Sequence, residues 1–299
     1  MNEDQQARQG VIFAISAYLM WGIAPIYFKT IQHVPPTEIL CHRVIWSFVF
    51  LGILIHAGKQ WLNVRFIFNN RKQLLFLTAT SFLVGSNWLL FIWSVNNDHM
   101  LDASLGYFIN PLFNVLLGMV FLGERLRKFQ WLAVALATTG VMIQIIIFGS
   151  IPVIAFVLAT TFGIYGLLRK KVAVDSQTGL FIETLILLPI AFIYLFFFAD
   201  TSTSHLSNNS WSLNGLLFLA GIVTTLPLLA FNNAATRLKL STLGFFQYIG
   251  PSLMFLLAIL IYGEDFRTDK AITFSFIWCA LLIFSFEGLN NRRKQRRKQ

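Results

Sequence analysis

The composition of this 299-residue chain is that of a membrane protein and excludes an ordinary soluble domain. Only 12% of the residues are charged, against about a quarter in soluble domains, and the mean hydropathy is +0.67. The two cysteines are too few for a disulfide framework. The net charge of +10 would suit nucleic-acid binding, so the distribution of the basic residues along the chain has to be considered before that function is accepted.

Ten apolar segments are long enough to cross a bilayer as helices, which takes about 20 residues each. In chain order we predict spans at 11–28, 38–56, 74–95, 103–122, 129–148, 152–168, 180–199, 212–231, 242–262 and 271–288. The first apolar run is too long for a cleavable signal peptide and is followed by further spans, so we expect a first transmembrane helix.

The basic residues gather in alternate connections between these spans. If the N-terminus is cytoplasmic, nineteen of the 23 Lys and Arg lie in cytoplasmic segments and three in outside loops. Cytoplasmic loops carry such an excess, so we predict a multi-pass membrane protein with both termini in the cytoplasm. The basic tail after the last span is then an anchor on an anionic leaflet, and we expect no nucleic-acid partner.

One stretch of the chain recurs later in recognisable form. LGYFINPLFNVLLGMVFLGE at 105–124 is matched by LGFFQYIGPSLMFLLAILIYGE at 243–264. Pro111 pairs with Pro251, and Glu124 with Glu264, in this match. The first helices of each half agree only over short matches, such as Glu38 with Glu183. The chain therefore reads as a duplication.

Ten helices in two copies give five helices per copy, and an odd number forces the copies to cross the membrane in opposite directions. We predict an all-α membrane protein with ten transmembrane helices in two inverted five-helix repeats. The repeats are 1–148 and 149–299, the second with the basic cytoplasmic tail, and together they form one transmembrane domain. Inverted repeats are typical of secondary transporters, whose site lies between the halves near the midplane.

Proline residues and polar side chains mark the helices expected around that site. Pro111 and Pro251 each free a carbonyl four residues earlier, so we predict paired hinges there. Polar and aromatic side chains near these breaks are predicted to line a substrate cavity: Trp21, Asn87, Trp88, Tyr107, Asn110, Gln247 and Tyr248. Hydrogen bonding between helices is an equally good interpretation for each intramembrane amide.

Charged side chains inside the spans are the remaining candidates. Arg43 lies one to two turns into the second span and should face protein or water, paired with Glu38 or Glu183. A structural ion pair and a substrate or proton site fit it equally well. We favour Glu183 over Glu38 for proton coupling, because its span has no adjacent basic residue.

The sequence contains no phosphate-binding G-x-x-x-x-G-K-[ST] motif and no metal-binding spacing of histidines. We therefore expect no cofactor and no metal, and we expect the energy to come from a gradient or from the substrate's own concentration difference. The expected partners are a small-molecule substrate and the lipid bilayer, and a homodimer is left open.

The five-plus-five plan, the WGIAP at 21–25 and the two P-x(11)-GE blocks resemble the EamA group of the drug/metabolite transporter superfamily. The resemblance implies an inner-membrane permease with a basket-like ten-helix fold and a central cavity. We therefore predict a secondary transporter of a small organic metabolite or drug that works by alternating access. The alternatives are an intramembrane enzyme using Glu38, His42 and Arg43, or a membrane scaffold.

Overall fold

The computed structural model describes residues 3–96, 99–172, 174–204, 206–261 and 268–296, and these residues form helices and no strand. The helices are α1 (Glu3–Thr30), α2 (Pro36–Ala57), α3 (Trp61–Asn69), α4 (Arg71–Asn96), α5 (Met100–Leu122), α6 (Lys128–Phe148), α7 (Val153–Val172), α8 (Ser176–Phe197), α9 (Trp211–Arg237), α10 (Leu240–Gln247), α11 (Ile249–Leu260) and α12 (Thr268–Arg296).

The ten predicted spans are confirmed, since ten helical stretches of the described chain are long and apolar enough to cross a membrane. The boundaries differ at one place that matters for function. Helix α7 continues to Val172, so Arg169 lies in its last turn and not in a loop. The prediction missed α3, a short helix between the second and third spans. Leu62 and Phe66 on α3 are exposed, as in a helix that lies at a membrane surface.

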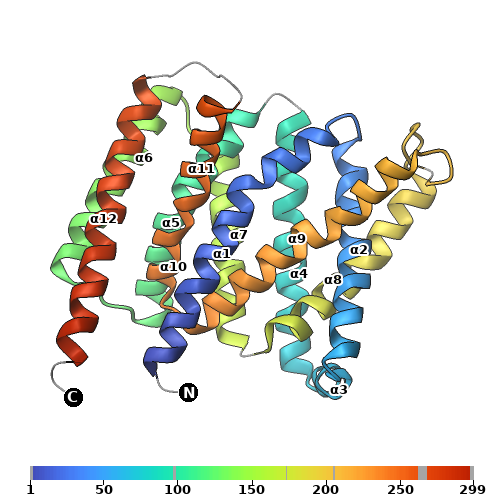
Figure 1. Cartoon of the computed structure of the whole chain (residues 1–299), viewed down its shortest axis with the longest axis horizontal. Coiled ribbons are helices and arrows are strands. Elements are labelled where there is room, and N and C mark those ends of the chain that lie inside the picture. The colour runs from blue at the N-terminus through green and yellow to red at the C-terminus, as the bar shows by residue number, and fades with distance from the viewer. Residues whose placement is uncertain (1–2, 97–98, 173, 205, 262–267, 297–299) are drawn as a thin grey trace.

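The helices form one bundle with both termini at the same end (Figure 1). This end, at the bottom of the view, also holds α3, and we call it the termini end. The loop at 31–35 and the described loop residues 198–204 and 206–210 lie at the opposite end. The arrangement agrees with an even number of crossings. Which side of the membrane each end faces stays a prediction.

Helix packing follows the pattern that an inverted repeat predicts. Helix α1 packs on α9. The counterparts of these two helices in the other repeat are α7 and α4, and they also pack on each other. Likewise α5 packs on α7, whereas α1 packs on α10 and α11, the counterparts of α5. Three further pairs join counterparts directly, namely α2 with α8, α5 with α10, and α6 with α12. The interface between the halves is therefore built from repeated contacts.

The two proline copies differ in structure, contrary to the expectation of paired hinges. Helix α5 runs unbroken through Pro111, whereas the second copy divides at Tyr248 into α10 and α11. Pro251 lies in the first turn of α11, where its missing N–H has no helical partner to lose. The last residues of the second repeat copy, Gly263 and Glu264, lie outside the described residues.

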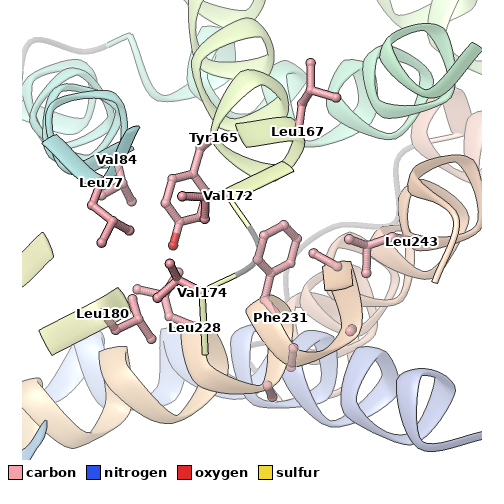
Figure 2. Close-up of a cluster of buried hydrophobic side chains, with 14 of the residues drawn as sticks. Leu77, Val84, Tyr165, Leu167, Val172, Val174, Leu180, Leu228, Phe231 and Leu243 are labelled. Carbon is pink, nitrogen blue, oxygen red and sulfur yellow. The ribbon is translucent and has the colours of Figure 1, made fainter. Parts of the chain in front are cut away.

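A buried apolar cluster fills the space where α1, α4, α7, α9 and α10 meet. Figure 2 labels side chains from α4, α7, α8, α9 and α10, with Tyr165 and Phe231 at the centre of the cluster. Both side chains are fully buried, and their rings stack 6.2 Å apart. Lipid offers an equally apolar environment, so close packing rather than water exclusion holds these helices together. The cluster fixes the helices that carry the polar groups described next.

Candidate functional site

Arg43 is the centre of the best-formed candidate site. It lies seven residues beyond the start of α2 at Pro36, which is about 10 Å along the helix. Its side chain is half-buried, and its Nε donates a 2.7 Å hydrogen bond to the Thr224 hydroxyl on α9. The Thr224 hydroxyl donates in turn to the Ala220 carbonyl at 2.7 Å, so its oxygen is available as an acceptor. This chain of bonds fixes one edge of the guanidinium.

Aromatic rings from three other helices surround the same guanidinium. The Arg43 Cζ lies 4.6 Å from the centre of the Trp88 ring on α4 and 5.6 Å from the Phe28 ring on α1. Both distances are within the range of cation–π attraction. The phenols of Tyr27 and Tyr107 are close enough to interact electrostatically with the charge. We call this group of six side chains, Phe28, Tyr27, Arg43, Trp88, Tyr107 and Thr224, the Arg43 cluster.

The expected pairing of Arg43 with Glu38 or Glu183 is wrong. Glu38 instead accepts hydrogen bonds from the hydroxyls of Thr201 at 2.6 Å and Thr203 at 2.8 Å, in the loop after α8. Among the described residues, Arg43 forms no ion pair and its terminal nitrogens donate no hydrogen bond. The cluster therefore holds a positive charge that no carboxylate of the described chain neutralises.

Glu183 has a basic partner that the sequence prediction did not foresee. The Arg169 Nη1 lies 3.6 Å from the Glu183 Oε1, and each side chain is about 99% buried. The span of Glu183 carries no basic residue, as the sequence shows, but Arg169 reaches it from the last turn of α7, which was predicted as a loop. The pair is tightly enclosed, because a Cβ at Gly179 would lie 2.0 Å from the same Nη1.

Hydrogen bonds extend this pair across four helices. The hydroxyls of Thr80 on α4 and Tyr165 on α7 donate to Glu183, at 2.5 and 3.3 Å. Asn232 on α9 donates to the Tyr165 hydroxyl at 2.9 Å. None of the three Arg169 guanidinium nitrogens has a hydrogen-bond partner within the described part of the chain. We call Thr80, Tyr165, Arg169, Glu183 and Asn232 the Glu183 network, and it lies toward the termini end, where α8 begins.

Sequence reasoning missed most of this network, although a signal was present. Glu38 and Glu183 are 145 residues apart, and the same offset relates Thr80 to Thr225 and Asn87 to Asn232. Three polar matches in one register align α2 and α4 with α8 and α9. The two glutamates therefore lie on corresponding helices that begin at opposite ends of the bundle, Glu38 in the first turn of α2 and Glu183 about two turns into α8, and each accepts hydrogen bonds from hydroxyl groups.

Three of the predicted cavity residues are buried between α5 and α10. Asn114 donates to the Gln247 Oε1 at 2.9 Å and to the Asn110 Oδ1 at 3.3 Å. The Tyr248 hydroxyl donates to the Phe108 carbonyl at 3.2 Å. Gln247 and Tyr248 are buried and bonded to α5 across the interface, whereas Asn110 is buried and accepts its hydrogen bond from Asn114 on the same helix. These contacts favour a structural role, and we leave the three residues out of the proposed site.

The other predicted cavity residues divide between two places. Trp21 packs in the aromatic cluster with Phe162 and Phe231, at ring distances of 5.9 and 5.8 Å. Asn87 links α4 to α7 through the Leu158 carbonyl and the Thr161 hydroxyl. Trp88 and Tyr107 belong to the Arg43 cluster, as described above.

The structure does not assemble the residues of the enzymatic alternative. No hydrogen bond or ion pair joins Glu38, His42 and Arg43 to one another among the described residues, and the buried His42 Nε2 has no partner there. Searching the same residues, we find no group of three or more His, Cys, Asp or Glu placed to hold a metal ion.

Comparison with known proteins decides the family. The profile of the EamA-like transporter family matches the chain twice, over residues 8–146 and 150–286. The chain belongs to the EamA-like transporter family. The two matches fall on either side of the predicted repeat boundary, and the resemblance seen in the sequence is confirmed.

Full-length relatives agree with this EamA assignment. The chain is 64% identical over 298 residues to an uncharacterized transporter of Vibrio cholerae, with 99% of each chain covered. It is 59% identical over 290 residues to protein RarD of Escherichia coli, covering 97% of this chain and 98% of that one. A solved crystal structure matches with a TM-score of 0.72 at 16% identity, over 92% of this chain and 96% of that one. That last likeness shows the fold alone.

Proposed function

We propose that this EamA-family protein is a secondary transporter that moves a small organic metabolite or drug by alternating access between its two halves. The observation that carries the proposal is that the same helix contact occurs twice, once as α1 on α9 and once between their counterparts α7 and α4. An inverted repeat with such contacts can exchange the conformations of its halves, which opens one side of the membrane as the other closes. An enzyme has no need of this arrangement.

The Glu183 network is our proposed closure of the termini end. It joins α4, α7, α8 and α9 by side-chain contacts, and Arg169 is enclosed with its nitrogens unbonded. Buried polar groups without partners cost free energy, so this closure is poised to rearrange when α7 and α9 separate. Glu38 and its two threonines are the corresponding contact at the opposite end.

The orientation follows from the basic residues. The termini end faces the cytoplasm in our proposal, because the positive-inside distribution places nineteen of 23 Lys and Arg there. The membrane is then the bacterial inner membrane, and the Glu38 contact faces outward.

We reassign the proposed coupling to protons from Glu183 to Glu38. Glu183 lies beside a buried cation, and such a partner favours the charged form of a carboxylate and opposes the effect of burial. Glu38 has only neutral hydroxyl partners among the described residues, although it is also buried. If the transporter exchanges protons, Glu38 is therefore the better candidate, and Glu183 is structural in this conformation.

Solute flux in proteoliposomes tests the proposed function. Purified protein should accelerate saturable uptake of at least one member of a metabolite and drug panel, relative to empty liposomes. If no solute moved while a lipid-linked substrate was converted, the enzymatic alternative would replace transport.

A further inference from the structure

We propose that Arg43 binds the carboxylate of a small organic monoanion, so that the substrate class of the proposed transporter is carboxylic acids with an apolar or aromatic body. That the bound anion is a transported substrate depends on the proposed function. That Arg43 binds a carboxylate depends only on the contacts of the Arg43 cluster.

The first reason is the charge balance of the cluster. A charged side chain inside the membrane is costly, and in known membrane proteins it pairs with an opposite charge or faces a polar pathway. The two carboxylates that the sequence offered as a counter-charge are engaged elsewhere, Glu38 by threonines and Glu183 by Arg169. An anionic ligand supplies the missing charge when it binds.

The second reason is which part of the guanidinium remains unbonded. Thr224 holds the Nε edge, and the rings of Trp88 and Phe28 lie within cation–π distance. The unbonded part consists of the terminal nitrogens, whose fork of N–H groups matches the two oxygens of a carboxylate. Arg169 differs in this respect, because it is sealed from solvent beside its own carboxylate.

The neighbours of Arg43 define the rest of the ligand. A single guanidinium balances one negative charge, which suits a carboxylate better than a phosphate carrying about two charges. Trp88 and Phe28 offer aromatic surface next to the bound charge. The Tyr107 hydroxyl, which has no hydrogen-bond partner within the described residues, provides an additional donor or acceptor.

Two matched probe pairs test the inference by ligand-dependent thermal shift on the purified full-length protein. Benzoate is compared with benzamide, and butyrate with butyramide, because each amide has the shape of its acid without the charge. We expect at least one carboxylate to bind saturably and its amide to bind about tenfold to a hundredfold more weakly, from the strength of charge-assisted hydrogen bonds. Arg43→Gln should abolish carboxylate binding, and Arg43→Lys should weaken it.

The control variant is Arg237→Gln. Arg237 also lies over an aromatic ring, Phe13 at 5.3 Å, but near the termini end and bonded to Asn233. It should bind the carboxylates like the wild type. Should Arg43→Gln fail to fold, protection of wild-type Arg43 from phenylglyoxal by the carboxylates, and not by the amides, gives the same information.

Three results would overturn the inference. The first is that wild type and Arg43→Gln bind the carboxylates equally well. The second is that an acid and its amide bind equally well. The third is that neither carboxylate binds and neither protects Arg43 from phenylglyoxal. Failure of the transport proposal has a different signature. In that case carboxylate binding at Arg43 would persist, but no bound solute would cross a proteoliposome membrane.

Discussion

Replacing Glu183 by Gln tests whether the buried pair with Arg169 is structural. The change keeps the shape and one acceptor oxygen for the Thr80 hydroxyl, but it removes the negative charge. At the observed 3.6 Å and an effective dielectric constant of about 20, the lost attraction is about 5 kcal/mol. Removing one partner of a buried pair generally costs about 3–5 kcal/mol, since the other charge stays buried. We expect a loss of that size.

The assay is equilibrium unfolding in mixed detergent and SDS micelles, followed by tryptophan fluorescence. Glu287→Gln is the matched control, because Glu287 is 11% exposed and its partner Arg127 is 46% exposed, so this pair reaches solvent and should contribute about 1 kcal/mol or less. Adding Arg169→Met to Glu183→Gln should recover much of the lost stability, because no charge then remains buried. If Glu183→Gln lowered the free energy of unfolding no more than the control did, Glu183 would be uncharged in this fold. Glu183 would then again be the better candidate for proton coupling.

Three further predictions concern coupling, packing and topology. Glu38→Gln should reduce the response of transport to an imposed proton gradient while leaving the stability within about 1 kcal/mol, and an unchanged response would exclude Glu38 from coupling. Gly221→Ala should destabilise the protein by about 1–3 kcal/mol, because its Cβ would lie 2.5 Å from the backbone of α2. Gly215→Ala, on the same helix with nothing within 4 Å, should be neutral in the same unfolding assay, and equal effects would refute the close approach of α9 to α2. A cysteine at Ser207 should react with an impermeant reagent from outside and one at Gln299 only from inside, and the reverse labelling would refute the inverted topology.

The fold was predictable because its signals are long and repeated. Apolar runs set the ten spans, and the odd number of helices per copy leads to inversion by counting. The predicted ends of helices were less accurate where polar or charged residues follow an apolar run. Arg169 was assigned to a loop because Arg, Lys and Lys usually follow a span, but α7 continues through them. That single shift hid the partner of Glu183.

The site was predicted only in part, because a sequence shows which residues are unusual and not which of them meet. Arg43, Trp88 and Tyr107 were named as site candidates from the sequence, and the structure brings them together from three helices. Gln247 and Tyr248 carry the same kind of signal, yet they are buried between α5 and α10. An intramembrane amide bonds equally well across an interface or toward a substrate, so only the packing separates the two outcomes.

Solute counterflow tests the central claim, transport by alternating access, most directly. Proteoliposomes preloaded with an unlabelled transported solute should take up the labelled solute faster than empty proteoliposomes, since the loaded protein returns to the outer side with each exchange. Uptake should also saturate with concentration. Folded protein that shows equal uptake with and without preloading, in linear proportion to the solute, would contradict alternating access.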